Sequence, residues 1–183
     1  EIERYIRFQG ATNTSFDIIV ASGPHSALPH ARKTERKIRN NEPVLIDMCV
    51  EYKGYKSDLT RVFFLGKMNL LFRKVYSIVH TAQQKAKNAI RPGVSIDYID
   101  REARQYIAQK GFANNFKHSL GHGIGLETHE LPKIASKNKQ RLKPGMIFTL
   151  EPGIYLDGRF GVRIEDMVLV TEKGREILSV SGN

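Results

Sequence analysis

The sequence predicts an α+β fold in which antiparallel strands lie before and after a helical middle section. Apolar runs of strand length, bounded by turn-forming glycine and proline, occur in both outer parts of the chain. Between them, apolar residues recur at helical spacing. Each strand-rich half also carries two acids inside apolar segments, which suggests a duplicated architecture with a site between the halves.

The N-terminal part is expected to contain one short helix followed by three strands. Gly10 is typical of a helix C-terminus, and Lys53-Gly54 is a plausible tight turn between two strands. In order, we expect a helix ending at residue 10, a strand over 15–22, a turn over 23–26, a basic loop to residue 41, and strands over 43–50 and 55–65.

Two helices are expected next, and the chain then returns to strands. Apolar residues spaced three and four apart predict a helix from about residue 69 to residue 90, which Pro92-Gly93 ends. Ser95 is a candidate N-cap for a second helix that ends at Gly111. The remaining strands are expected over 115–120, 146–155 and 161–171.

Four acids and one histidine occupy positions where a metal site would need them. The acids interrupt apolar strands, and buried carboxylates are costly unless their charge is cancelled. The histidine lies in a glycine-rich run over 121–125, and glycines permit close backbone approach. Such a mixed oxygen and nitrogen set favours manganese, cobalt, iron or zinc over a thiolate-type site. The five candidate ligands are Asp47, Asp58, His122, Glu151 and Glu165.

The first pair of acids fits a plain hairpin. A two-residue turn at Lys53-Gly54 sets Thr60 opposite Asp47, so Asp47 and Asp58 become diagonal neighbours on one face. Their backbones would then lie roughly 7–8 Å apart. The two carboxylates can therefore meet over a cation, and they would repel one another without it.

The second pair does not fit a plain hairpin. A two-residue turn at Asp157-Gly158 would place Glu151 and Glu165 on opposite faces of the ribbon. We therefore expect an odd-length loop or a bulge, and Pro152-Gly153 is a natural place for a break in the pairing.

The bulk composition fits one soluble domain with a substantial core. The chain has 183 residues, 40% of them hydrophobic, and no apolar run reaches the roughly 18 residues of a membrane span. It begins without methionine or a signal peptide, so we expect a fragment of a longer protein. The single cysteine, Cys49, excludes an internal disulfide and indicates the cytoplasm.

The net charge of +10 gathers in two segments, residues 31–37 and 133–143. Such segments can attract nucleic acid or acidic peptides. No aromatic residues interleave these lysines as base-stacking side chains would. We therefore interpret the segments as solvated loops, or as charge offset by another part of the protein, and expect no nucleic-acid or membrane partner.

The motifs together resemble the pita-bread metallopeptidases, and within them the Xaa-Pro aminopeptidases (aminopeptidase P) and Xaa-Pro dipeptidases (prolidase). The resemblance extends from Ser15 to about Leu178. Its most specific stretches are Ala27-Leu28-Pro29-His30, Leu45-Ile46-Asp47, Ser57-Asp58-Leu59-Thr60-Arg61, the run over 118–127, His129-Glu130, Glu151-Pro152-Gly153-Ile154-Tyr155 and Val162-Arg163-Ile164-Glu165-Asp166.

This resemblance implies a fold of two pseudo-twofold halves, with a curved antiparallel sheet covered by helices. It also implies two divalent metal ions, of which Mn²⁺ is preferred over Co²⁺, Fe²⁺ and Zn²⁺. Asp47 and Asp58 would hold one ion, His122 and Glu151 would help to hold the other, and Asp58 and Glu165 would bridge them.

The resemblance further implies roles for the residues around the metals. Glu151 would serve as general base, and His129 would stabilise the tetrahedral intermediate. His118 and His30 would line the substrate site, with His118 also counted among the catalytic residues. Arg163 would support a bridging carboxylate or the substrate.

Two features depart from the family pattern. Many relatives have glycine where this chain has Cys49, two residues after Asp47. We interpret Cys49 as a small buried replacement. The other interpretation is an oxidant-sensitive thiol near the metals, which unchanged peroxide sensitivity in Cys49→Gly would exclude.

The second departure concerns the domains. Residues 1–183 are expected to form a single catalytic domain that lacks the family's N-terminal domain, which helps to enclose substrate and to form homo-oligomers.

The function expected first is an aminopeptidase that removes the residue preceding proline from a peptide with proline in second position. A dipeptidase acting on Xaa-Pro is the alternative, because the motifs do not separate the two. A methionine aminopeptidase fits the proline-directed motifs less well. A pseudo-peptidase that only binds peptides is a distant alternative, since such proteins lose ligands and this chain retains all five.

Overall fold

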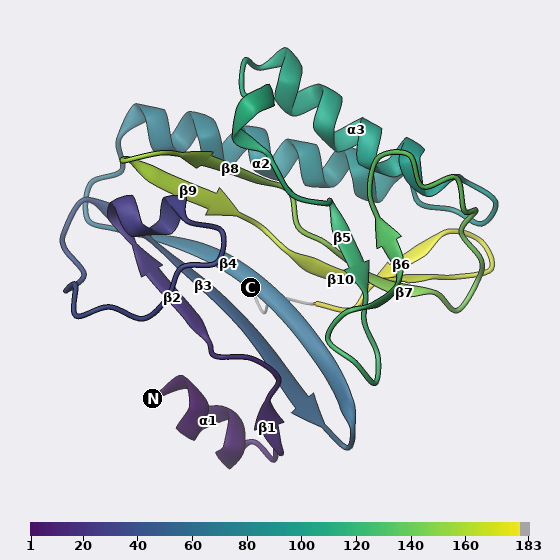
Figure 1. Cartoon of the computed structure of the whole chain (residues 1–183), viewed down its shortest axis with the longest axis horizontal. Helices are drawn as coiled ribbons and strands as arrows, with labels where there is room; N and C mark the ends of the chain where they lie inside the picture. The colour runs from purple at the N-terminus through teal and green to yellow at the C-terminus, as the bar shows by residue number, and fades with distance from the viewer. Residues whose placement is uncertain (180–183) are drawn as a thin grey trace.

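The computed structural model describes residues 1–179 as a mixed arrangement of antiparallel sheets and two long helices (Figure 1). The elements in chain order are α1 (Ile2–Phe8), β1 (Asn13–Thr14), β2 (Ile19–Ser22), η1 (Gly23–Ala27), β3 (Glu42–Tyr52), β4 (Tyr55–Leu65), α2 (Leu70–Ala89), α3 (Ile96–Gln109), η2 (Ala113–Asn115), β5 (Gly121–Gly123), β6 (Glu130–Ile134), β7 (Ile147–Leu150), β8 (Gly153–Leu156), β9 (Phe160–Arg163), β10 (Asp166–Val170) and β11 (Arg175–Ile177).

The first sheet is built around the long hairpin β3–β4, with β1 and β2 on the other edge of β3. Lys53 and Gly54 both have positive φ, 50° and 82°, as the two central residues of a type I′ turn require. The two-residue turn sets Asp47 opposite Thr60 and Cys49 opposite Asp58. The predicted register of this hairpin is therefore confirmed.

The second sheet has the strand order β11-β10-β7-β5-β6, and β8 and β9 form a separate ribbon. The expected strand over 146–155 is thus divided into β7 and β8. The expected strand over 161–171 is likewise divided into β9 and β10. The chain passes from the sheet into the ribbon at Glu151, and it returns from the ribbon to the sheet at Glu165.

The helices α2 and α3 lie side by side and cover the strands of the C-terminal half (Figure 1). Asn69 caps α2 by accepting a hydrogen bond from the Phe72 N–H at 2.8 Å. Ser95 precedes α3 as predicted, but its hydroxyl makes no capping bond to the helix backbone. The apolar faces of both helices enter one core, in which Val75, Val79 and Ile99 are fully buried.

Two strand predictions were wrong in part. Residues 115–120 contain the end of η2 and an irregular segment, and the strand begins only at Gly121. Arg104 of α3 donates to the carbonyls of Phe116 and His118 at 3.1 and 2.9 Å, so these groups need no strand partner. The expected strand over 15–22 is restricted to Ile19–Ser22.

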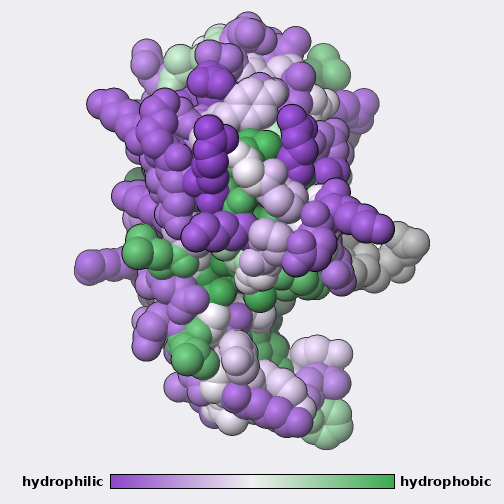
Figure 2. All heavy atoms as spheres, turned by 90° about the vertical axis from the view of Figure 1, so that its right-hand side faces the viewer, coloured by the Kyte–Doolittle hydropathy of each residue, from purple (hydrophilic) through white to green (hydrophobic). Residues whose placement is uncertain are grey.

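The exposed side chains include many charged residues and several large apolar ones. Figure 2 shows one face, on which hydrophilic side chains cover most of the upper part and hydrophobic ones gather in the middle and lower parts. Leu131 is the most exposed large aliphatic residue of the described chain, with 83% of its surface accessible. Across residues 1–179, every helix is too short or too polar to serve as a membrane span.

Candidate active site

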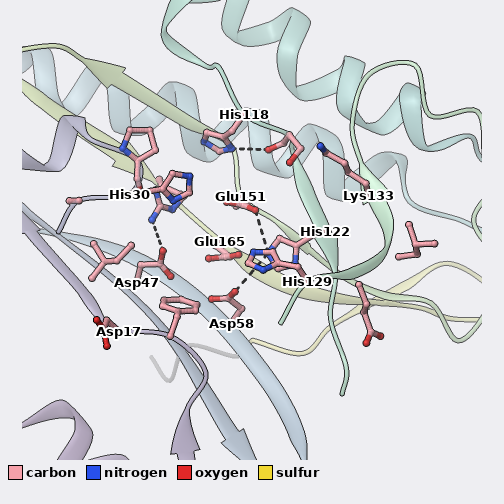
Figure 3. Close-up of a pocket in the computed structure, with 18 residues that line it drawn as sticks. Asp17, His30, Asp47, Asp58, His118, His122, His129, Lys133, Glu151 and Glu165 are labelled. Carbon is pink, nitrogen blue, oxygen red and sulfur yellow. Dashed lines mark hydrogen bonds and ion pairs between the residues drawn. The ribbon is translucent and has the colours of Figure 1, made fainter. Parts of the chain in front are cut away.

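All nine residues singled out from the sequence line one cavity of about 800 Å³ between the two strand systems (Figure 3). The strands of both halves contribute to its walls. The cavity residues predicted from the sequence are His30, Asp47, Asp58, His118, His122, His129, Glu151, Arg163 and Glu165.

The acids of the first hairpin are buried and only partly paired. Asp47 and Asp58 are 8% and 4% exposed. Asp47 Oδ2 accepts a hydrogen bond from Arg163 at 2.5 Å. The other oxygen of each acid, Oδ1, is buried and has no hydrogen-bond partner. Unpaired buried carboxylate oxygens are costly, so both acids are suited to a cation that the protein chain itself does not supply.

The acids of the second pair face one another because of the predicted irregularity. The loop between β8 and β9 pairs Leu156 with Phe160 and so contains three residues rather than two. This odd length brings Glu151 and Glu165 opposite one another in the continued register. The strands part at this point, because the Glu151 N–H donates to Leu120 and the Glu165 N–H donates to Thr60 of β4.

The imidazole of His122 is turned towards the acids. Its Nδ1 lies 3.0 Å from the Gly123 carbonyl, which orients the ring. Its Nε2 then lies 3.8 Å from Asp58 Oδ2 and 3.6 Å from Glu151 Oε1. A backbone partner on one ring nitrogen and carboxylates around the other is a common arrangement for a metal-binding histidine.

The glycines beside His122 are required by close packing. A Cβ at Gly121 would lie 1.8 Å from the Thr149 carbonyl oxygen, and one at Gly123 would lie 2.3 Å from the Leu131 carbonyl oxygen. Side chains at these positions would push β5 away from its neighbours and displace His122 from the acids.

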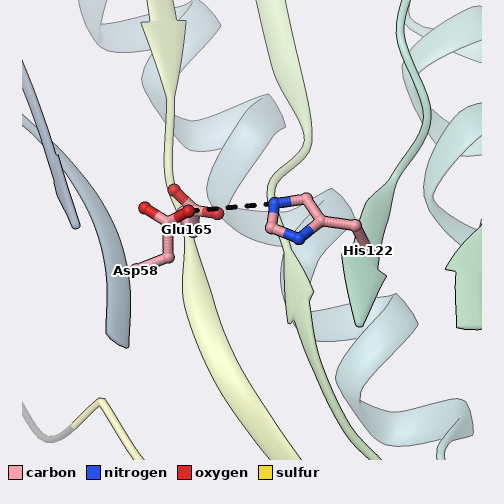
Figure 4. A group of neighbouring side chains, drawn as sticks. All are labelled: Asp58, His122 and Glu165. Atoms are coloured by element: carbon pink, nitrogen blue, oxygen red, sulfur yellow. Dashed lines mark ion pairs between the residues drawn. The ribbon is translucent and has the colours of Figure 1, made fainter. Parts of the chain in front are cut away.

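Three of the five candidate ligands already converge. One ligand atom each from Asp58, His122 and Glu165 lies within 4.8 Å of the others, as a shared metal ion would need (Figure 4). They come from β4, from β5 and from the residue before β10. The convergence therefore joins the first sheet to the second.

The negative charges of the acids repel one another. Burial, and then the neighbouring Glu165, raise the pKa of Asp58 to about 10. Burial, and then Asp47, raise the pKa of Glu165 to about 7. Burial and Glu165 also raise the pKa of Glu151 well above its usual value. The four carboxylates cannot all be ionised near neutral pH unless cations are added, so the residues present fit a site for divalent metal.

Arg163 connects three parts of the site. Its guanidinium donates to Asp47, to the Tyr155 hydroxyl at 2.8 Å and to the Thr60 hydroxyl at 3.2 Å. Thr60 in turn donates to Glu165 Oε2 at 2.7 Å. Arg163 is 3% exposed, and these contacts hold it against the acids.

The histidines of the cavity differ in their surroundings. His118 Nε2 lies 3.0 Å from the Tyr155 hydroxyl, and burial lowers the His118 pKa to about 4, so its ring is neutral at physiological pH. The ring of His129 lies 4.3 Å from that of His122, measured between centroids. His30 lies in the loop that follows η1 and lines the opposite wall of the cavity (Figure 3).

Cys49 lies next to the site but is closed off from it. The residue is fully buried, and burial raises the pKa of its thiol. A buried thiol that keeps its proton is unreactive. This environment supports the interpretation of Cys49 as a small packing residue.

Three residues of the site were missed by sequence reasoning. Thr60 could have been found, because it alternates with Asp58 on β4 and shares its face. Tyr155 ends the stretch over 151–155 that carries the resemblance, but it was given no role, and it contacts Arg163 and His118 beside the cavity. Lys133 carries no such signal, because the segments that surround it in the cavity are distant in sequence. Lys133 lines the cavity, and its amino group pairs with no acid in the part of the chain that the structure describes.

The comparison with known families decides the classification. The model of metallopeptidase family M24 matches residues 1–172. The chain belongs to metallopeptidase family M24. This match, and the similar solved structures described below, confirm the pita-bread fold that the resemblance implies.

Similar M24 proteins carry the names of both expected activities. The chain is 43% identical to an Xaa-Pro dipeptidase from Pyrococcus furiosus, over 98% of this chain and 51% of that protein. An Xaa-Pro dipeptidase from Bacillus anthracis is 46% identical with a TM-score of 0.96, over 100% of this chain and 51% of that one. An X-Pro aminopeptidase from Thermotoga maritima is 42% identical with a TM-score of 0.96, over 99% and 51%. The chain spans about half the length of these relatives.

Proposed function

We propose that this M24 chain is the catalytic part of a metal-dependent Xaa-Pro dipeptidase. The observation that supports a peptidase site most directly is the convergence of four acids, three of them buried, and His122 on one cavity. The aminopeptidase expected first from the sequence becomes the second candidate, because dipeptidase names are prominent among the relatives of this chain.

Two divalent metals, for which Mn²⁺ is our first choice, would be held by Asp47, Asp58, His122, Glu151 and Glu165. Metal ions in such a site supply Lewis acidity and make water a better nucleophile at neutral pH. The unpaired Oδ1 atoms of Asp47 and Asp58 and the mutual repulsion of the acids support this assignment. Arg163 and Thr60 would keep Asp47 and Glu165 oriented.

The remaining site residues would act on substrate and protons. Glu151 lies at the cavity wall with a raised pKa and would accept a proton during hydrolysis. His129 would donate a hydrogen bond to the developing charge on the scissile carbonyl. His118 and His30 would contact the peptide, and the neutral His118 ring can donate or accept.

Lys133 supports the dipeptidase over the aminopeptidase. Its amino group is an unpaired cation on the cavity wall within the described chain (Figure 3). In an Xaa-Pro dipeptide, the carboxylate directly follows the proline ring and so lies close to the scissile bond. A cation in the cavity would favour a substrate with that carboxylate over a longer peptide.

The test is hydrolysis of Ala-Pro and of Arg-Pro-Pro with manganese and then with chelator. Chelator-sensitive cleavage with preference for Ala-Pro is expected. Preference for release of arginine from the tripeptide would establish the aminopeptidase instead. Bound metal without cleavage of either peptide would indicate that further parts of the protein are needed. Absence of both metal binding and cleavage would support the peptide-binding alternative.

Glu151→Gln provides the matched variant, because it preserves size while removing the proton acceptor. We expect its turnover of Ala-Pro to fall roughly 10²–10⁴-fold while some metal is retained. Lys117→Gln, a lysine-to-amide change at an exposed position away from the cavity lining, is the control. Undiminished turnover in Glu151→Gln would refute the assignment of the base.

For the protein as a whole we propose that residues 1–183 form one catalytic domain, to which an N-terminal domain is joined in the full-length protein. That domain would help to enclose the substrate and to form a homo-oligomer. We propose the cytoplasm as the location, on the strength of the single buried cysteine. Mass measurement of the full-length protein in solution tests the oligomer.

A further inference from the structure

The helix α2 carries an amide in the middle of its apolar face. Gln83 is 1% exposed and lies among Val79, Ala82 and Ala86, all of which are fully buried. A buried amide is costly unless its hydrogen bonds are made. The contacts of Gln83 therefore identify what this residue does in the fold.

The Gln83 amide nitrogen donates two hydrogen bonds, both to backbone carbonyls. One goes to Leu150 at 3.1 Å and the other to Ile164 at 3.0 Å. Leu150 immediately precedes Glu151, and Ile164 immediately precedes Glu165. One nitrogen thus holds the two strands together at the point where their own pairing is interrupted.

Other contacts fix each glutamate to its own surroundings. The N–H of Glu165 donates to Thr60, and the carbonyl of Glu165 accepts from Arg61 at 2.5 Å. The N–H of Glu151 donates to Leu120 at 2.8 Å. Within residues 1–179, Gln83 is the side chain that donates hydrogen bonds to the residues before both glutamates. It reinforces a single long backbone bond at the break, from the Ile164 N–H to the Pro152 carbonyl at 3.4 Å.

A second polar residue of α2 follows the same pattern one turn later. Lys87 is buried, and its amino group lies 2.5 Å from Asp166 Oδ2, next to Glu165 in the chain. Arg61 binds the other oxygen of Asp166 at 2.6 Å. Two polar side chains four residues apart on one helix face thus serve the same strand break.

We propose that Gln83 is a positioning residue for the metal centre. By holding the Leu150 and Ile164 carbonyls at one nitrogen, it sets the distance between the Glu151 and Glu165 side chains and thereby the affinity of the site for metal. This inference rests on the proposed function, in which both glutamates bind metal. Gln83 itself does not reach the cavity lining.

The test is calorimetric titration of the metal-free protein with Mn²⁺. Gln83→Met preserves the length of the side chain and removes both hydrogen bonds, so we expect Mn²⁺ affinity to fall by about 10-fold or more. Gln84→Met is the matched control, because it makes the same change at the next, less buried position, for which no hydrogen bond is present among the described residues. Its affinity should equal that of the wild type.

A second control separates positioning from loss of stability. Val75→Ala removes core volume from the same helix without touching the glutamates, so it should lower the melting temperature and leave Mn²⁺ affinity unchanged. Wild-type affinity in folded Gln83→Met would overturn the inference. Failure of the wild type to bind Mn²⁺ would instead overturn the proposed function.

A measurement on the wild type covers the case in which Gln83→Met does not fold. The side-chain ¹⁵N–H₂ signals of Gln83 should shift when Zn²⁺ is added, because the carbonyls that they bind belong to the residues before two ligands. The Gln84 signals should remain in place. Unchanged Gln83 signals in metal-loaded protein would also overturn the inference.

Discussion

At the scale of single residues, the cavity concentrates negative charge beyond what its own cations offset. Arg163 is bound directly to Asp47, whereas Asp58 faces three other acids. The folded chain without metal therefore keeps protons on groups that the unfolded chain would release. This difference couples the stability of the metal-free protein to pH.

We expect the metal-free protein to lose stability as pH rises from 6 to 8. Unfolded Asp58 loses its proton near 3.8, whereas its pKa in the folded chain is raised to about 10, so the folded state binds more protons over this range. The contribution of Asp58 to the free energy of unfolding is therefore fully present below pH 3.8, and it is lost progressively as pH rises towards 10. Urea denaturation with chelator should show a decrease of roughly 1–3 kcal/mol over these two pH units.

The matched variant for this effect is Asp58→Asn, which cannot ionise. Its metal-free form should show a flatter pH dependence than the wild type. An equal dependence in both proteins would show that Asp58 is not the source. Added Mn²⁺ should abolish the loss of stability between pH 6 and 8 in the wild type, because bound cations favour the ionised acids.

Residue-level prediction succeeded where the local sequence carried the signal. The turn between their strands placed Asp47 and Asp58 on one face. A plain two-residue turn would have put Glu151 and Glu165 on opposite faces, and this conflict with a shared site indicated an irregular loop. Lys133 and Gln83 could not be placed, because distant segments form the cavity that Lys133 lines and carry the carbonyls that Gln83 binds. A glutamine on an otherwise apolar helix face was the available signal for Gln83.

At the scale of secondary-structure elements, the loop between β8 and β9 determines which way Glu151 and Glu165 point. Its three residues set the register of the ribbon, and the same register continues into β7 and β10. A change of one residue in loop length turns every following side chain to the other face. The loop is thus a remote determinant of the proposed metal site.

Deletion of Arg159 should therefore abolish tight metal binding. A two-residue loop would leave Glu151 and Glu165 on opposite faces, and only one could reach Asp58. Calorimetry with Mn²⁺ should show an affinity reduced by more than about 100-fold. Arg159→Ala keeps the loop length at an exposed position and should bind as the wild type does. Wild-type affinity in the deletion variant would contradict the register argument.

The elements were predicted best where periodicity and caps agreed. The helix over Leu70–Ala89 and the hairpin β3–β4 appeared within a residue or two of expectation. The strands after residue 111 were predicted less well. Partners such as Arg104 and Thr60 satisfy backbone groups there, and a sequence pattern does not show contacts between distant elements.

At the scale of the whole molecule, metal binding should join the two halves of the fold. Asp47 and Asp58 come from the first sheet, whereas His122, Glu151 and Glu165 come from β5 and the two strand breaks. A ligand that binds only when both halves are assembled stabilises the folded state by mass action.

Mn²⁺ at 100 times its dissociation constant should stabilise the protein by about 2.7 kcal/mol. For a chain of this length, that corresponds to a rise in melting temperature of roughly 5–10 °C. Calorimetric scans with Mn²⁺ and with chelator measure the difference. Asp58→Asn should lose most of it. A chelator-independent melting temperature in wild-type protein would argue against a site that spans both halves.

The distance in sequence between the acids has a consequence for the protein during synthesis. The hairpin that carries Asp47 and Asp58 leaves the ribosome well before Glu151 and Glu165 have been translated, and domains emerge from the N-terminus onward. The pair on β3 and β4 can collect only a loosely held cation at that stage. Tight capture has to wait until β10 has docked against β7. If the acids hold metal as proposed, metal loading is restricted to molecules whose folding is complete, and an unfinished or truncated chain would lack the proposed metal centre.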